Sequence, residues 1–508
     1  MSVFLAKELS STLHTKITIG RVNLGVFNRL IIDNLQIDDQ TGKELLKVTR
    51  ASVKFNLFPL FKKKISITNA QLFGFNIRLQ KNAPNAIPNY QFILDAFAPK
   101  DSIKKNNSLD LRINSLLIRR GRMSYNVLST KKTPEKFNPQ HFNIKNFRAD
   151  ISLKVLQRDS INAAIKRLSL EEEQSGSKLK KLSLKILANN KKMRIENFAI
   201  ELQNTSLKMD TIRMDYDSLS AFNHFADKIH FSFRILPSTI TLHDLSAILP
   251  TFTPFKEPLE VELEAKGTIN QLNCPILSIS AKNHFRLKGN VSLQDLSHPE
   301  ETFIFGHLSN LYADQEGIAF FVRNLSNKNN SIPPILQRLG TVSFHGEISG
   351  YFTELVTYGI IHTDIGTVRT DLKLKSDKNK GYFAYSGAIK TSDFELGKLI
   401  ENPKLGKITL NLDIKGNQYN KQYPQVIIKG LIPSIDYSNY TYRNITLNAE
   451  YKQGGFSGKL ALNDNNGSIT LNGDINTTSK TPTFNFQANI RNVRPHDLHL
   501  TKNYKGAI

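Results

Sequence analysis

The sequence has one cysteine, no tryptophan and no long apolar run. The single cysteine, Cys274, excludes an intramolecular disulfide framework and any metal centre built on several cysteines. No stretch approaches the ~20 apolar residues of a membrane-spanning helix, and residues 1–15 lack the charged start and cleavage site of a signal peptide. There is also no phosphate-binding glycine-rich loop, Gly-x-Ser-x-Gly or His-Glu-x-x-His motif. We therefore predict no enzyme, no cofactor and no metal site.

What the chain does have is length and positive charge. Its 508 residues allow either about three compact domains or one elongated, repetitive domain. Lys and Arg number 68 against 44 Asp and Glu, a formal net charge of +24. Such an excess indicates nucleic acid, a lipid surface or simply a solvated basic face. The basic residues alternate with apolar ones along the chain, and no nucleic-acid-binding signature is present, so we expect no nucleic acid partner.

The dominant hydrophobic period is two residues, which is typical of strands with one apolar face. It occurs in residues 53–57, 73–79, 182–186, 231–235, 259–265, 408–414 and 484–490. Turn signals separate such runs at Asn379-Lys380, Gly454-Gly455 and residues 465–467. We therefore expect many antiparallel strands, roughly 30 at about 15 residues per strand and turn.

Few segments have the apolar spacing of an amphipathic helix. Residues 2–13 and 89–98 are plausible short amphipathic helices, and shorter pieces fall near 159–168, 218–226, 243–249 and 332–338. The polar segments 101–108 and 324–331 are candidate loop breaks, and the strand pattern resumes after each. A sheet of this size exposes its apolar face unless it curls, packs on a second sheet as a β-sandwich, or holds something apolar.

A few polar residues are candidates for chemistry. His243-Asp244 and His496-Asp497 could each be a base with its carboxylate, but strand neighbours point to opposite faces, so we expect surface or turn roles. The acidic run 171–173 could bind a cation, although consecutive carboxylates seldom converge, so we expect a solvated loop. We expect Cys274, beside Pro275, to be a small buried or turn residue.

Several short segments, taken in order along nearly the whole chain, resemble the AsmA-like superfamily. The N-terminal ones are residues 3–6 (VFLA), 16–22 (KITIGRV), 27–30 (FNRL), 35–39 (LQIDD), 45–46 (LL) and 58–65 (FPLFKKKI). Later ones are similar to the Bacteroidetes branch of TamB, the translocation and assembly module: 159–163 (DSINA), 168–169 (LS), 173–176 (EQSG), 236–245 (LPSTITLHDL), Pro250, 339–340 (LG), 394–397 (FELG) and 405–406 (LG).

The resemblance implies a mainly β fold: an elongated antiparallel sheet curled into a U-shaped groove (β-taco), with short N-terminal and connecting helices. Residues 1–15 would form the helix after a membrane anchor, 16–100 an AsmA/chorein-like region, and 101–508 the repetitive groove. The resemblance also implies that the chain is an N-terminal portion. Its members begin with a transmembrane helix before the VFLA segment and end in a C-terminal domain that has no counterpart here.

The function implied is envelope biogenesis: a bridge-like conduit that carries phospholipids across the periplasm, from inner to outer membrane, along an apolar trough. We expect Phe55, Leu57, Phe73, Phe75, Ile77 and Leu79 to line this trough. Lys62, Lys63 and Lys64 would either contact anionic head groups or keep a hairpin tip soluble. The alternatives are a periplasmic scaffold that couples the inner membrane to an outer-membrane assembly protein of the Omp85 type, and an adhesin-like β-solenoid.

Overall fold

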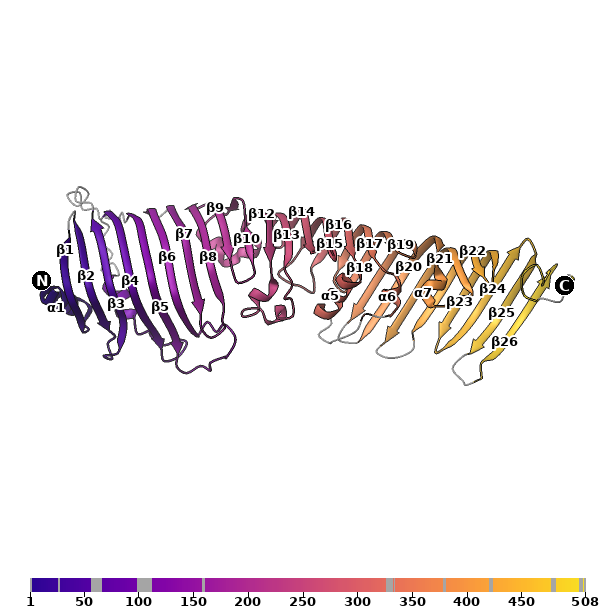
Figure 1. Cartoon of the computed structure of the whole chain (residues 1–508), viewed down its shortest axis with the longest axis horizontal. Helices are drawn as coiled ribbons and strands as arrows, with labels where there is room; N and C mark the ends of the chain where they lie inside the picture. Colours follow the sequence, from indigo (N-terminus) through magenta and orange to yellow (C-terminus); the bar gives the residue numbers. More distant parts are fainter. Residues whose placement is uncertain are drawn as a thin grey trace. The chain divides into compact units, whose positions relative to one another are not determined.

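The computed structural model describes residues 2–25, 28–55, 66–97, 112–157, 160–325, 332, 334–377, 381–419, 424–476, 481–501 and 506. These residues are mainly β: 26 strands assigned to a largely antiparallel sheet, with a few short helices (Figure 1). The predicted fold class is confirmed at this level. The chain divides into two compact units, Met1–Thr268 and Ile269–Ile508, which we describe separately.

The first unit starts with helix α1 (Ser2–Leu13), which packs on strand β1 through the buried side chains of Leu13 and Ile17. Its strands are β1 (Ile17–Gly25), β2 (Arg29–Asp38), β3 (Glu44–Phe55), β4 (Ser66–Lys81), β5 (Arg112–Val127), β6 (His141–Gln157), β7 (Ser160–Glu172), β8 (Lys178–Asn189), β9 (Lys192–Glu201), β10 (Ser206–Lys208), β11 (Ile212–Asp215), β12 (His230–Ile240) and β13 (Leu259–Thr268). Its short helical turns are α3 (Gln91–Phe97), η1 (Leu219–His224), α4 (Phe225–Lys228), η2 (Leu242–Leu245) and η3 (Pro250–Phe252).

One pair of strands in the first unit departs from the expected antiparallel order. β4 and β5 are parallel, with Ile77 beside Met123. Parallel neighbours cannot be joined by a tight hairpin and need a crossover connection. The chain between them, which includes α3, is that crossover. All other pairings within this unit are antiparallel among the described strands.

In several strands of the first unit, the regular alternation of side chains between the two faces of the sheet is interrupted at one residue. Asn34, Gly74 and Arg120 have positive φ angles of 53°, 63° and 56°, so one residue in each of β2, β4 and β5 leaves the extended conformation. The strand register aligns these three residues in a row with one residue of β1 and one residue of β3. We call this row the crease: Gly20, Asn34, Thr49, Gly74 and Arg120. Because the two-residue period is broken there, apolar residues three apart on one strand share a face.

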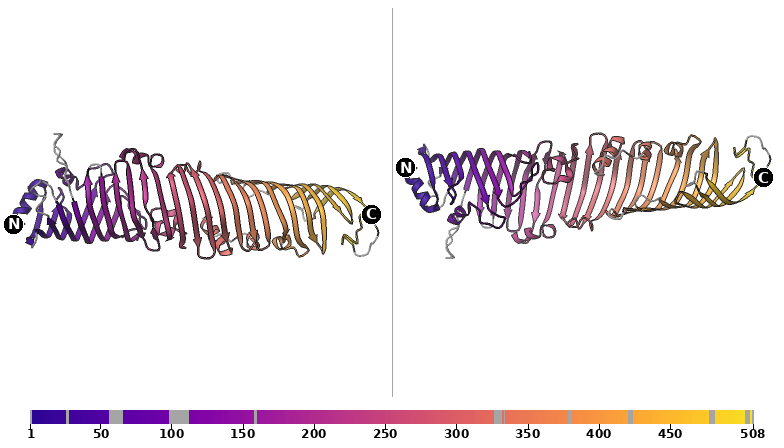
Figure 2. Two further views of the ribbon diagram at one scale, coloured as in Figure 1. Left: turned by 90° about the horizontal axis from the view of Figure 1, so that it is seen from above. Right: turned by 90° about the horizontal axis from the view of Figure 1, so that it is seen from below.

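The second unit is an antiparallel meander in which each strand pairs with the next. Figures 1 and 2 show its strands following one another in chain order. The strands are β14 (Gln271–Ala281), β15 (Phe285–Gln294), β16 (Phe303–Ala313), β17 (Val342–Tyr351), β18 (Glu354–Thr363), β19 (Gly366–Asp377), β20 (Tyr382–Phe394), β21 (Leu405–Tyr419), β22 (Gln425–Tyr437), β23 (Tyr440–Lys452), β24 (Gly455–Asp464), β25 (Gly467–Asn476) and β26 (Thr483–Arg491). Its helices are α5 (Gln315–Leu325), α6 (Pro334–Arg338) and α7 (Leu396–Ile400).

Glycines allow close approach of strands in the second unit. Gly346 of β17 pairs directly with Gly359 of β18. A Cβ at Gly346 would lie 2.2 Å from the Tyr358 carbonyl oxygen, and one at Gly359 would lie 2.4 Å from the His345 carbonyl oxygen. Later strands repeat this close approach to a partner carbonyl at Gly387, Gly430, Gly458 and Gly473. Only glycine fits where a neighbouring backbone comes this near.

The cores are small and local. In the first unit, Tyr216, Ala221 and Ile229 form a buried cluster at η1 and α4. In the second, Ile365, Phe394 and Ile408 form another beside α7. Many large apolar side chains, such as Phe305, Phe456 and Phe484, stay exposed.

Most local predictions are confirmed. Strands occupy all seven predicted alternating runs over their described residues, and turns lie at residues 453–454 and 465–466. The signal at Asn379-Lys380 and the loop 101–108 lie outside the described residues. Helical structure occurs in every predicted segment except 159–168, which was wrong because β7 starts at Ser160 and pairs with β6 and β8. The helices α5 and α7 were not predicted, and α5 covers the start of the predicted loop break 324–331.

Candidate functional site

The candidate site is the apolar face of the strands, where the sequence predicted a lipid-lining surface. Of the residues predicted there, Leu57 and the three lysines Lys62, Lys63 and Lys64 lie outside the described residues. Phe55 ends β3, opposite Ile67 of β4. The remaining four, Phe73, Phe75, Ile77 and Leu79, lie on β4.

The crease separates Phe73 from the other three. Gly74 stands between Phe73 and Phe75 with a φ of 63°, so the two rings do not share an environment. Phe73 is 38% exposed and contacts a hollow lined with arginines. Phe75 is 8% exposed, its ring lies edge-on to Phe147 at 5.8 Å, and it fills the space that the absent side chain of Gly121 leaves. Phe73 is therefore separated from Phe75, Ile77 and Leu79, although the sequence predicted that all four share one face.

Ile77 and Leu79 continue an apolar ladder across the first unit. Ile77 lies between Leu46 of β3 and Met123 of β5, and Leu79 lies beside Tyr125. The ladder extends to Ile37 of β2 and Ile144 of β6. Ile77 and Leu79 are half-buried, since neighbouring side chains cover them only in part. The structure therefore brings Phe75, Ile77 and Leu79 together on one face.

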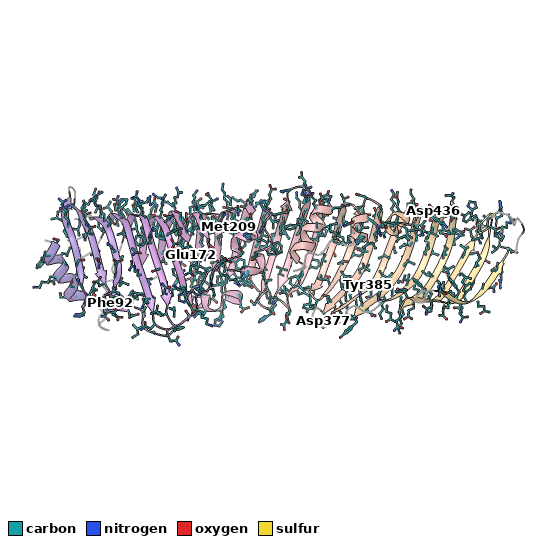
Figure 3. All side chains as sticks on the ribbon, turned by 60° about the horizontal axis from the view of Figure 1, so that its bottom comes forward. Phe92, Glu172, Met209, Asp377, Tyr385 and Asp436 are labelled. Carbon is teal, nitrogen blue, oxygen red and sulfur yellow. The ribbon has the colours of Figure 1, made fainter. Side chains whose placement is uncertain are left out.

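The apolar face is most exposed in the last strands of the second unit. Phe456 of β24, Ile475 of β25 and Phe484 of β26 lie directly opposite one another and are 46%, 37% and 62% exposed. Phe486 and Ile490 continue the same face of β26 and are exposed too. Further along the face, Tyr385 packs over Gly416, and burial raises the pKa of its hydroxyl (Figure 3). All described strands belong to the same sheet, so no separate second sheet covers these rings.

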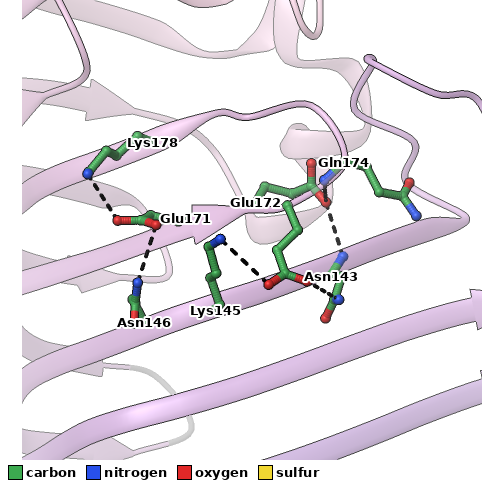
Figure 4. Close-up of polar contacts among 8 residues, drawn as sticks. Asn143, Lys145, Asn146, Glu171, Glu172, Gln174 and Lys178 are labelled. Carbon is green, nitrogen blue, oxygen red and sulfur yellow. Dashed lines mark hydrogen bonds and ion pairs between the residues drawn. The ribbon is translucent and has the colours of Figure 1, made fainter.

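The acidic run 171–173 is not the solvated loop that was expected. Glu172 is buried and accepts hydrogen bonds from the backbone N–H of Asn143 and of Gln174, both at 3.1 Å (Figure 4). It also accepts one from the backbone N–H of Ser175 at 2.7 Å. The Ser175 hydroxyl donates a fourth, at 2.6 Å. Burial raises the pKa of Glu172, but these hydrogen bonds outweigh it, so the pKa lies below its ordinary value. The carboxylate fixes the turn between β7 and β8.

Its two neighbours in the run bind other residues. Glu171 forms an ion pair with Lys178 at 3.0 Å (Figure 4). Glu173 pairs with Lys145 at 3.7 Å and accepts a hydrogen bond from Asn143. Asn143 binds both Glu172 and Glu173, through its backbone N–H and its side-chain amide respectively, and Glu171 pairs with Lys178. The three carboxylates are thus bound by protein donors and do not converge on one ion.

The other polar candidates have structural partners as well. The Nδ1 atom of His243 lies 2.8 Å from the Thr253 carbonyl oxygen, while Asp244 accepts from Asn204. His496 lies 3.3 Å from Asp497 in an exposed turn. Cys274 is buried in β14, and burial raises the pKa of its thiol, which disfavours the reactive thiolate.

One group of residues has the composition of a metal site. Ligand atoms of Asp295, His298 and Glu301 lie within 4.8 Å of one another in the turn after β15. The Nδ1 atom of His298 is 2.8 Å from Asp295, so this histidine already has a partner in the turn. The side chains are largely open to solvent.

No family model, curated protein or solved structure matches this chain. The likeness to the TamB branch therefore stays a prediction from short segments. Among the described residues, no helix has both the length and the apolar character required to cross a membrane.

Proposed function

We propose that the chain carries phospholipids between the inner and outer membranes of a cell envelope, with acyl chains on the apolar face of a sheet that curls into a trough. The exposed ladder of Phe456, Ile475 and Phe484 is the observation that carries this proposal. Contiguous exposed apolar side chains are unfavourable in water and are typical of a surface that binds a partner or ligand.

The physical role of such a surface is to replace water around the acyl chains. Each CH₂ group transferred to water costs about 0.8 kcal/mol, so extracting a two-chain lipid costs tens of kcal/mol. A continuous apolar lining removes most of that cost. The close-approach glycines of the second unit support the curl, since strands can bend sharply where no Cβ intervenes.

The test is to purify the full chain from cell envelopes and quantify co-purified phospholipid by mass spectrometry. The variant Phe456→Glu/Phe484→Glu places two charges on the apolar ladder, at positions that are 46% and 62% exposed. The matched control, Asn448→Glu/Asn472→Glu, adds the same charge on the polar face, where both residues lie opposite Lys459.

We expect several lipids per chain in the wild type and the control, and at least a tenfold loss in the Phe456→Glu/Phe484→Glu variant with an unchanged circular dichroism spectrum. Absence of lipid from the wild type would contradict the proposal and favour a periplasmic scaffold. Equal loss in the control would also contradict it, because the apolar face would then have no special role.

A further inference from the structure

The positive charge of the chain is concentrated near its N-terminus. Residues 1–200 contain 36 Lys and Arg against 15 Asp and Glu, whereas residues 201–508 contain 32 against 29. Residues 1–200 therefore carry +21 of the net charge of +24. A field of one sign over a short stretch of sheet attracts anionic partners.

The crease gathers arginines from several strands. Five residues on neighbouring strands β1 to β5 lie side by side in the sheet. Each is paired with the next in the order Arg21, Asp33, Arg50, Phe73 and Arg119. Two hollows of about 620 and 480 Å³ follow this row and share Thr49 and Phe73. Their basic lining residues are Arg21, Arg50, Arg119, Arg120 and Arg148. We call these five arginines and Phe73 the arginine crease. This set lies along the crease defined above and shares only Arg120 with it.

One carboxylate lines these hollows beside the five guanidinium groups. Asp33 binds Arg50 at 2.6 Å, and this hydrogen bond lowers the pKa of Asp33. Arg119 donates to the carbonyl oxygens of Ile118 and Ala149 at 2.8 and 3.0 Å, and it has no carboxylate partner among the described residues. Among the described residues, Arg120 and Arg148 form no ion pair. Arg120 also adopts a positive φ, a conformation that Gly or Asn takes more readily.

Apolar side chains lie within and near this basic surface. Phe73 is 38% exposed between Arg50 and Arg119. At the same end of the unit, α1 exposes Val3 and Phe4, which are 80% and 72% accessible, while it packs on β1. Arginines interspersed with exposed aromatic and aliphatic side chains suit a surface that presents both phosphate groups and hydrocarbon.

We propose that the arginine crease docks the first unit on a membrane surface rich in anionic phospholipids. The guanidinium fork matches phosphate oxygens with two parallel hydrogen bonds, and Phe73 inserts between head groups. Two short, shallow hollows favour a membrane over single-stranded nucleic acid, which needs a groove that follows its backbone. The docking surface is distinct from the exposed apolar ladder and does not depend on the proposed lipid carriage.

The test is flotation of the full chain with vesicles of phosphatidylcholine, with and without phosphatidylglycerol. The variant Arg119→Gln/Arg120→Gln/Arg148→Gln removes three charges from the arginine crease. The control Lys131→Gln/Lys132→Gln/Lys136→Gln removes three charges from an exposed loop between β5 and β6. We expect binding of the wild type only when phosphatidylglycerol is present. Since each basic residue at an anionic surface contributes about fivefold, the crease variant should bind about a hundredfold more weakly.

The control should bind within about threefold of the wild type. The lysine variant Arg119→Lys/Arg120→Lys/Arg148→Lys should recover only part of the binding, since lysine keeps the charge and loses the paired hydrogen bonds of the guanidinium fork. If the glutamine variant does not fold, the variant Phe73→Ser tests the proposal instead. We expect it to bind the anionic vesicles severalfold more weakly than the wild type. Equal weakening in the loop control would overturn the proposal, as would unchanged binding in the crease variants. Binding to duplex DNA in place of vesicles would overturn it too.

Discussion

At the scale of single residues, Glu172 shows how burial changes the role of a charged side chain. Three consecutive glutamates suggest a solvated loop, yet the middle one is 4% exposed and accepts four hydrogen bonds. A buried carboxylate is costly unless its oxygens are bound, and here they are bound by the backbone of the turn and of β6. Through these hydrogen bonds, Glu172 stabilises the turn of the β7–β8 hairpin.

We expect Glu172→Gln to lower the free energy of unfolding of this region by about 2 kcal/mol at pH 7, because hydrogen bonds to a charged acceptor are lost. The folded-state pKa of Glu172 lies below its unfolded value. The stabilisation is thus complete above the unfolded pKa of about 4.3 and is lost as pH falls through the folded value.

Thermal unfolding of both proteins between pH 7 and pH 3 measures this effect, and the difference between them should narrow as the pH falls. Glu173→Gln is the matched control, since its exposed side chain should contribute less than about 1 kcal/mol. A constant difference across this pH range would refute the assignment.

At the scale of strands, backbone conformation decides what each face presents. The crease moves Phe73 away from the environment of Phe75 through the single positive φ of Gly74. In the second unit, Gly346 and Gly359 let β17 and β18 approach at a point where the ring of Phe344 covers both. Such positions constrain the sequence more tightly than the alternation of apolar and polar residues does.

We expect Gly346→Ala to destabilise the second unit by about 2 kcal/mol, because its Cβ would collide with the backbone carbonyl of Tyr358. Gly306→Ala in β16 is the control, because its Cβ would meet nothing closer than 3.4 Å. Chemical denaturation followed by circular dichroism compares the two. Equal stability of both variants would show that the strands can separate at Gly346 without cost.

At the scale of the whole molecule, the two proposed surfaces should act independently. The glutamine variant of the arginine crease should keep its co-purified phospholipid, and Phe456→Glu/Phe484→Glu should keep its binding to anionic vesicles. The reason is that the altered side chains belong to different units. Measuring both properties on both variants tests this. Loss of both properties in either variant would indicate that a single surface serves both roles.

Much of the fold was predictable because strands need only a local pattern. Alternation in residues 408–414 and 484–490 specifies a strand with one apolar face wherever its partners lie. The segment 159–168 was misassigned because short apolar runs suit a helix or a strand equally well, and pairing with β6 and β8 decided the outcome.

The candidate site was less predictable than the fold. Phe75, Ile77 and Leu79 do share an apolar face, as their spacing predicted. The arginine crease was missed, although a signal exists: apolar residues three apart around a polar pair, as at Ile32 and Leu35 or Ile144 and Phe147. This spacing breaks the period of two at the point where a strand leaves the extended conformation.

The sequence by itself determined that this protein is mainly β, that its strands have one apolar face, and that it carries a large positive charge. Those properties depend on local periodicity and composition. The tertiary structure alone decided that β4 and β5 run parallel, that Phe73 joins the arginines, and that Phe456, Ile475 and Phe484 form an exposed ladder. These features depend on which strands pair and on the φ angle of single residues such as Gly74, which no local pattern fixes.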